Sequence, residues 1–504
     1  MTGFLPHTPD EVEAMLDAIG VDSIDALFSA IPPQLQGLCQ FDVMPASGLD
    51  ELGLQQFFKQ FTEANLAHHY DCFVGGGAYN RFVPPAVNHI ASRSEFYTAY
   101  TPYQPEVSQG TLQMIYEFQT MVSELVGLDV TNASVYDGAS AFSESAVMAV
   151  RIAKKRHTLL VSKTVNPHYR AVLDTYTGVL DHINVVPVDL TADLEAQCCA
   201  VGVPPNQVAA VLVQLPNYLG FLEDQAMVTA FCKAHGALKV AAVDPVALGV
   251  MAAPGKSEAN PDGADIVCGE LQQFGNYVNF GGPYGGFVST SMAHVRQLPG
   301  RLVGCSKDRT GKRAYTLTMQ TREQHIRRAK ATSNICTNQS LNILKASAYL
   351  SLVGPSGLKH LALLSAQRAH RLADQLCRMI GVSLLSAAPY LNEFTLTLPV
   401  AAQAVVESMV ANHGLVPGIP LSRYESYFPN QPHALVVAVT EMNTPESLDR
   451  YVYALHHALT QLGAQPGPEP RMPAPAASGL PKSVMSRSVP SQHVPNHKGV
   501  VQHV

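Results

Sequence analysis

Between residues 159 and 267, short apolar runs alternate with helical segments in a regular order. The runs are Leu159–Val161, Ile183–Val188, Ala209–Leu215, Val240–Val243 and Ile266–Val267. Each is the length of one buried strand, and helices between successive strands are typical of parallel sheets. The segment therefore predicts an α/β fold, in which a mostly parallel sheet is wound with helices.

We expect a helical arm over residues 1–70. The α/β segment then belongs to a large domain over residues 71–340. Thr8 and Glu11 have the spacing of a capping box, which predicts a first helix. A second helix is expected after Ser23, and four apolar side chains should be buried there: Ile24, Leu27, Phe28 and Ile31.

The C-terminal part divides into a second domain and a tail. Helical patterns at residues 341–352, 358–380 and 445–462 flank strand-like runs at 393–398 and 435–440. This order predicts a smaller α+β domain over residues 341–463. Residues 464–504 are rich in proline and serine and lack periodicity, so we expect a disordered tail.

Charge and composition exclude several classes of protein. The chain has 33 Lys+Arg against 40 Asp+Glu, a net charge of -7, which excludes a basic nucleic-acid-binding protein. It has no apolar run long enough to span a membrane and no signal-peptide pattern, so we expect a cytoplasmic protein with no membrane partner. Nine cysteines without a Cys-x-x-Cys pair predict reduced thiols and no metal site.

Two features of the α/β segment are suited to a phosphate-bearing cofactor. The turn containing Asp137, Gly138 and Ser140 opens a helix, whose first amides can hold a phosphate. Asp244 follows the strand 240–243, where a carboxylate could keep the ring nitrogen of pyridoxal protonated. A tight turn at Gly138 and a simple turn at Asp244 are the alternatives.

Residues 301–330 form a basic segment, with nine Lys+Arg against two acids. Such a segment attracts carboxylates, phosphates or an acidic partner, although a solvated surface is the usual explanation of a basic run. Polar residues interleaved with the charges could orient a bound group. The residues alone do not decide between the two interpretations.

Four stretches closely resemble the glycine cleavage P-protein family: Phe73–Pro85, Ser92–Gly110, Ala133–Ser140 and Thr316–Asn338. The resemblance extends from about residue 5 to residue 463 and is closest to the N-terminal half, or separate subunit 1, of glycine dehydrogenase (decarboxylating). It implies the fold-type-I, or aspartate aminotransferase, fold of pyridoxal phosphate enzymes. Ala329, a long loop at residues 255–263 and the tail depart from the family pattern.

A fold-type-I enzyme needs a lysine on the turn after the strand that follows the ring-nitrogen aspartate. Here that turn is Cys268–Phe274, and no lysine lies between Lys256 and Lys307. No internal aldimine can form without this amine. The resemblance explains the gap, since the first subunit of two-subunit P-proteins has an unoccupied site and subunit 2 carries pyridoxal phosphate.

The resemblance further implies an α2β2 heterotetramer that decarboxylates glycine and transfers the aminomethyl group to the lipoyl arm of H-protein. Five residues are candidates for supporting roles in catalysis: Tyr100, Tyr103, Arg322, His325 and Asn334. Packing within the subunit or at an interface is the alternative for each of them. Two other functions stay open, a catalytically silent scaffold for the lysine-bearing partner and an independent pyridoxal enzyme that uses Lys256.

Overall fold

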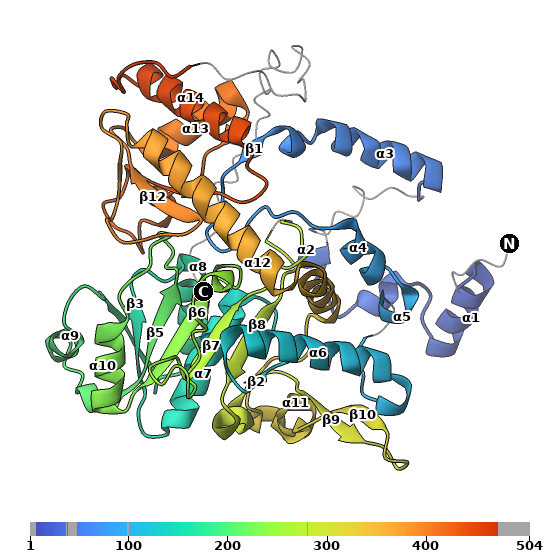
Figure 1. The fold of residues 1–504 in the computed structure, drawn as a ribbon. Coiled ribbons are helices and arrows are strands. Elements are labelled where there is room, and N and C mark those ends of the chain that lie inside the picture. The colour runs from blue at the N-terminus through green and yellow to red at the C-terminus, as the bar shows by residue number, and fades with distance from the viewer. Residues whose placement is uncertain (1–6, 37, 39–47, 98–99, 280, 472–504) are drawn as a thin grey trace. The chain divides into compact units, whose positions relative to one another are not determined.

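The computed structural model describes residues 7–471, apart from residues 37, 39–47, 98–99 and 280 (Figure 1). It consists of two compact units, Met1–His68 and His69–Val504. The first unit contains α1 (Pro9–Ile19), α2 (Pro33–Gln36) and α3 (Glu51–Ala64). Both hydrogen bonds of the predicted capping box are present at α1, because Thr8 Oγ1 accepts from the Glu11 amide and Glu11 accepts from the Thr8 amide.

The prediction of a second helix is wrong in the length of the helix and in the burial of its apolar side chains. Only Asp25–Phe28 is helical, as a single 3-10 turn, and the first unit buries none of the four side chains at Ile24, Leu27, Phe28 and Ile31. The described helices of this unit bury none of their residues, so no apolar face is covered within them.

The second unit is built on a seven-stranded sheet that contains all five predicted strands. These are β3 (Thr158–Ser162), β4 (Asn184–Val188), β5 (Val208–Leu215), β6 (Leu238–Val243) and β7 (Ile266–Glu270), and they run parallel in the order β7-β6-β5-β3-β4. Two further strands, β8 (Gly286–Thr290) and β2 (Val130–Thr131), extend the β7 edge by antiparallel pairing. The sheet confirms the α/β fold.

Helices cover both faces of this sheet. Leu160 and its register partner Val211 face the core that includes α6 (Gln109–Val126). The next pair, Val161 and Leu212, faces the core that includes α7 (Gly138–Ala153). Because successive residues of a strand point to opposite faces, burial of both faces explains the uninterrupted apolar runs.

A second, smaller sheet has its own core. Its order is β11-β12-β15-β14, with β11 (Ser383–Leu384), β12 (Glu393–Thr397), β14 (Ile419–Pro420) and β15 (Ala434–Ala438) in antiparallel pairing. The helices α13 (Ala402–His413) and α14 (Pro445–Gln461) pack here, and β1 (Asp71–Cys72) pairs with β13 (Leu415–Val416) beside this core.

The long helix α12 (Ser340–Leu376) joins the two cores, as Figure 1 shows. It is two helices merged across a kink at Gly354, whose φ is +61°, and Pro355 follows directly. Tyr349 lies in the core of the large sheet, whereas Leu372 lies in the core of the small one.

The remaining helices and strands connect the elements of the two sheets. The helices are α4 (Pro85–Ala91), α5 (Ser94–Tyr97), α8 (Pro167–Thr177), α9 (Leu194–Ala200), α10 (Ala226–His235) and α11 (Gln324–Arg327), and β9 (Val303–Lys307) pairs with β10 (Arg313–Leu317). At the start of the predicted tail, Pro466 O accepts from the Ile380 amide, while residues 472–504 lie outside the described part. No helix of the described residues is long and apolar enough to cross a membrane.

Candidate functional site

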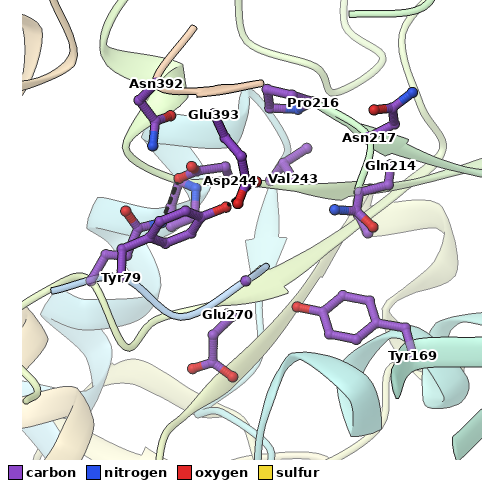
Figure 2. Close-up of a pocket in the computed structure, with 14 residues that line it drawn as sticks. Tyr79, Tyr169, Gln214, Pro216, Asn217, Val243, Asp244, Glu270, Asn392 and Glu393 are labelled. Carbon is purple, nitrogen blue, oxygen red and sulfur yellow. Dashed lines mark hydrogen bonds between the residues drawn. The ribbon is translucent and has the colours of Figure 1, made fainter. Parts of the chain in front are cut away.

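A crevice lies where the parallel strands of the large sheet end. Asp244 follows β6, Glu270 ends β7, and Glu393 begins β12 of the small sheet. Figure 2 shows these carboxylates around one small space, with Tyr79 pointing to Glu393 and Tyr169 toward Glu270. Ligands of open α/β sheets bind at this edge, so this is the position at which the fold would hold its cofactor.

Asp244 already has donors within the chain. Its Oδ1 accepts from Gln273 Nε2 at 2.6 Å and from the Val246 amide at 2.9 Å. Gln273 lies in the turn after β7, the segment in which fold-type-I enzymes carry their lysine. The Gln273 amide thus binds one of the two oxygens of the carboxylate that was expected to hold a pyridine nitrogen.

Two of the first amides of α7 also have acceptors within the chain. The Gly138 amide donates to Glu270 Oε2 at 2.8 Å, and the Ser140 amide donates to Asp137 Oδ1 at 2.7 Å. The other oxygen of Glu270 accepts from the amides of Leu271, Gln272 and Gly285. Burial raises the pKa of Glu270 to about 8, although these backbone donors lower it. Two side chains of the chain therefore stand where a phosphate would lie.

The space beside Asp244 is too small for the pyridine ring of pyridoxal phosphate. The innermost cavity, between Asp244, Glu270 and Glu393, has about 20 Å³, which is room for a single water molecule. A wider cavity of about 520 Å³ adjoins it and reaches Asp137 and His168. Asp244 lines the innermost cavity and Asp137 lines the wider one, while the Gly138 and Ser140 amides donate to side chains of the protein itself.

Glu393 closes the crevice from the side of the small sheet. Its Oε1 accepts from the Gly76 amide at 2.7 Å, and its Oε2 lies 2.9 Å from the Tyr79 hydroxyl. Gly75 must be glycine, because a Cβ there would meet the side chains of Glu393, Ala438 and Tyr79. Burial raises the pKa of Glu393 to about 7, and it raises the pKa of the Tyr79 phenol as well.

Replacement of Glu393 by Gln is expected to remove part of the pH dependence of stability. The folded chain keeps the Glu393 proton to a higher pH than the unfolded chain, so unfolding releases a proton and stability falls as the pH rises toward 7. Gln can still accept from Gly76 and donate to Tyr79. Relative to the wild type, the variant should gain about 2 kcal/mol between about pH 5 and about pH 8 in urea unfolding. An equal pH dependence of the two proteins would contradict an uncharged Glu393.

A second group of predicted residues meets in the basic segment. Arg301 Nη2 donates to the Tyr103 hydroxyl at 2.8 Å, and its guanidinium lies 5.2 Å from the Tyr103 ring centroid. Arg301 Nε lies 3.3 Å from Glu323 Oε2, and His325 Nδ1 lies 3.6 Å from the same oxygen. The Arg301–Glu323 pair is buried, whereas Tyr103 and His325 are exposed by 49% and 41%. The buried Arg301 thus holds the exposed Tyr103 ring by a hydrogen bond, and the exposed His325 ring lies beside the buried Glu323.

The other three predicted catalytic residues have different surroundings. Arg322 is buried and donates to the carbonyl oxygens of Leu298 and Gly300, so two backbone groups occupy its guanidinium. Asn334 Oδ1 accepts from Gln324 Nε2 at 3.0 Å. Tyr100 is exposed and forms no hydrogen bond with any described residue. The structure therefore brings together Tyr103 and His325 but not all five.

Sequence reasoning missed Glu270, Gln273, Glu323, Glu393 and Arg301 as site residues. Glu270 and Gln273 stand in the turn that lacks lysine, and this position is the only local signal for them. Arg301 reaches Tyr103 across 198 residues and Glu393 reaches Tyr79 across 314. Contacts of this range are set by the fold and leave no pattern in the local sequence.

Known proteins resemble this chain in sequence and in structure. Residues 2–455 match the family model of the glycine cleavage system P-protein. The chain is 43% identical to the probable glycine dehydrogenase (decarboxylating) subunit 1 of Desulfitobacterium hafniense over 89% of this chain and 98% of the relative. It is 44% identical to the protein of the same name from Chlorobium chlorochromatii over 90% of this chain and 98% of the relative.

Two solved structures resemble the fold. A crystal structure of glycine decarboxylase (P-protein) of the glycine cleavage system, in inhibitor-bound form, matches with a TM-score of 0.77 and 39% identity over 91% of this chain and all of that chain. A sphingosine-1-phosphate lyase from Burkholderia pseudomallei, at 13% identity and a TM-score of 0.59 over 83% of this chain and 92% of its own, shares the fold alone. From the family match and the identity over nearly all of each relative, this chain belongs to the glycine cleavage system P-protein family.

Proposed function

We propose that the chain is subunit 1 of a two-subunit glycine dehydrogenase (decarboxylating), the P-protein of the glycine cleavage system. It would work in the cytoplasm as an α2β2 heterotetramer with a subunit 2 that carries pyridoxal phosphate on its lysine. The observation that carries this proposal is the filled crevice: Gln273 holds Asp244, and Glu270 takes the first amide of α7. The relatives named subunit 1 match this chain over 98% of their length, which supports the same assignment.

The reaction removes carbon dioxide from glycine and passes the aminomethyl group to the lipoyl arm of H-protein. Pyridoxal phosphate on the partner would supply the electron sink for decarboxylation. The basic segment of this chain could receive an acidic carrier protein such as H-protein, since residues 301–330 carry nine cationic side chains against two acids.

In this proposal Tyr103 and His325 are presented to the partner's site. A phenol and an imidazole can orient a substrate or move a proton, and both rings are exposed while their supports are buried. Tyr100, which is also exposed, would extend the same contact. Arg322 and Asn334 would act indirectly, because Arg322 ties the segment to Leu298 and Gly300 and Asn334 is bound by Gln324.

The test is a complex co-expressed with a lysine-bearing subunit 2 and assayed for glycine–bicarbonate exchange. Tyr103→Phe removes the hydroxyl that would orient substrate or move a proton, and such groups contribute about 10²–10⁴-fold, so activity should fall at least about tenfold. His325→Gln should lower kcat and change the pH profile. Tyr97→Phe is the matched control, since Tyr97 is exposed on α5, apart from the Arg301–Glu323 pair.

Assembly is measured on the same samples by size-exclusion chromatography with light scattering. Loss of exchange in an intact complex supports direct participation of this chain. Full activity of both variants in an intact complex would leave the silent scaffold as the function of the subunit. A co-expressed complex without exchange activity would contradict the proposed reaction itself.

A further inference from the structure

A buried lysine lies at the other end of β6 from the crevice. Lys239 is the second residue of the strand and is 7% exposed, while Asp244 follows the last one. Its Nζ donates to Thr229 Oγ1 of α10 at 3.2 Å. Within the part of the chain that the structure describes, Lys239 has no ion pair. An ammonium has three N–H donors, and a buried one without a negative partner is costly.

Two cavities meet at this lysine. They measure about 590 Å³ and about 300 Å³, and both are lined by Thr229, Lys233, Lys239 and Asp262. The larger cavity has an apolar wall of small side chains, which includes Ala226, Ala230, Ala241, Met251, Ala252 and Pro254. The larger cavity thus has a polar end, at Lys239, and an aliphatic wall.

The carboxylates around the cavities are already engaged. Asp262 pairs with Lys233, and Asp265 Oδ1 pairs with Lys256 Nζ at 3.2 Å. Asp265 Oδ2 accepts from the Lys239 amide at 2.9 Å rather than from its ammonium. Asp224, at the start of α10, accepts from the Ala226 amide at 2.9 Å. Among the described residues of the lining, Lys239 and Asp224 are therefore the charged side chains without an ion pair.

We propose that this cavity binds a small aliphatic monocarboxylate, with the carboxylate on Lys239 and the hydrocarbon chain against the alanine and methionine wall. Thr229 accepts from Lys239, so its own hydroxyl hydrogen is free to donate to the second carboxylate oxygen. Burial of the chain and a charge-assisted hydrogen bond both favour binding.

The charges of the site favour a monoanion over a phosphate. A dianion would bring excess negative charge close to Asp262 and Asp265, whereas one carboxylate matches one ammonium. The loop at residues 255–263 supplies Lys256, Asp262 and Gly263 to the lining. The site therefore gives this loop a role that the proposed enzymatic function does not use.

The experiment is calorimetric titration of the full-length chain with hexanoate, together with saturation-transfer NMR. Saturable binding is expected, and Lys239→Met should weaken it at least about tenfold, since the charged hydrogen bond is lost. Lys256→Met is the matched control and should bind within about twofold of the wild type, because the exposed Lys256 is already paired with Asp265. Hexanol lacks the carboxylate and inorganic phosphate lacks the hydrocarbon chain, so both should bind more weakly than hexanoate.

A second variant guards against misfolding of Lys239→Met. Ala230→Phe leaves the lysine intact and places a ring in the larger cavity from an exposed position of α10, so it should also weaken hexanoate binding. Circular dichroism and melting temperature check the fold of each variant. The proposal is overturned if no saturable binding occurs up to about 10 mM hexanoate, or if folded Lys239→Met or Ala230→Phe binds like the wild type.

Discussion

Incubated with pyridoxal phosphate and no partner, the chain is expected to stay free of covalently bound cofactor. No aldimine absorbance should develop, borohydride should trap no pyridoxyl group stoichiometrically at one lysine, and glycine–bicarbonate exchange should be absent. The crevice explains this result, because Gln273 holds Asp244, Glu270 accepts from Gly138, and about 20 Å³ remains between them. Exchange should appear when a lysine-bearing subunit 2 is added.

The independent-enzyme alternative makes the opposite prediction for Lys256. This lysine lines the cavity beside Lys239, whereas Asp244 lines the crevice, and its Nζ is paired with Asp265 at 3.2 Å. Stoichiometric trapping on Lys256, lost together with activity in Lys256→Ala, would establish that alternative. Borohydride trapping followed by peptide mass spectrometry of the wild type and this variant decides between the two functions.

The parallel part of the large sheet could be predicted because its strands are continuous apolar runs. The strands β3, β5, β6 and β7 were recognisable because burial on both faces leaves few polar positions within each strand, Lys239 of β6 being one of them. β8 was not, because Gly286, Ser289 and Thr290 interrupt its apolar pattern and Thr131 pairs beside them on a two-residue strand. These buried hydroxyls have partners, because Ser289 and Thr131 bond to each other at 2.7 Å and Thr290 donates to the Asp265 carbonyl oxygen at 3.0 Å.

The position of the candidate site could be predicted from the sequence, but the hydrogen-bond partners of its residues could not. Asp244 could be placed by the strand that precedes it, and Asp137 by the helix that follows. That Glu270 would reach the Gly138 amide, 132 residues away, depends on how β7 lies beside α7. Likewise, Arg322 has the charge expected of a carboxylate-binding residue, but its burial turns it toward two backbone carbonyls.

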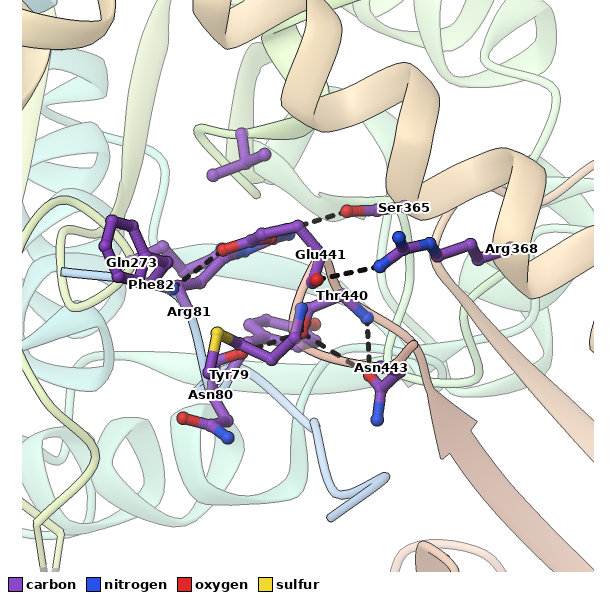
Figure 3. A network of polar contacts seen from close by, with 12 residues as sticks. Tyr79, Asn80, Arg81, Phe82, Gln273, Ser365, Arg368, Thr440, Glu441 and Asn443 are labelled. Carbon is purple, nitrogen blue, oxygen red and sulfur yellow. Dashed lines mark hydrogen bonds and ion pairs between the residues drawn. The ribbon is translucent and has the colours of Figure 1, made fainter. Parts of the chain in front are cut away.

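The same turn that holds Asp244 is connected to the small domain through one buried arginine. Arg81 Nε donates to Gln273 Oε1 at 2.9 Å, and its Nη1 donates to Ser365 Oγ of α12 at 2.8 Å and to Glu441 Oε2 at 2.7 Å. Figure 3 shows Arg81 at the centre of this network, between Gln273, Ser365 and Glu441. Both charged side chains are nearly inaccessible, with 1% of Arg81 and 9% of Glu441 exposed.

Replacement of Arg81 by Met is therefore expected to destabilise the chain by about 3–5 kcal/mol, because it leaves Glu441 buried without its cation. Urea unfolding measures the loss. Arg81→Met combined with Glu441→Leu should recover part of it, since the second change removes the uncompensated charge. Arg371→Met is the matched control: its pair with Asp449 spans 3.1 Å, but both side chains are nearly half exposed, so the loss should stay below about 1 kcal/mol. Equal losses of unfolding free energy for Arg81→Met and Arg371→Met would contradict a stabilising role of the buried Arg81–Glu441 pair between the two cores.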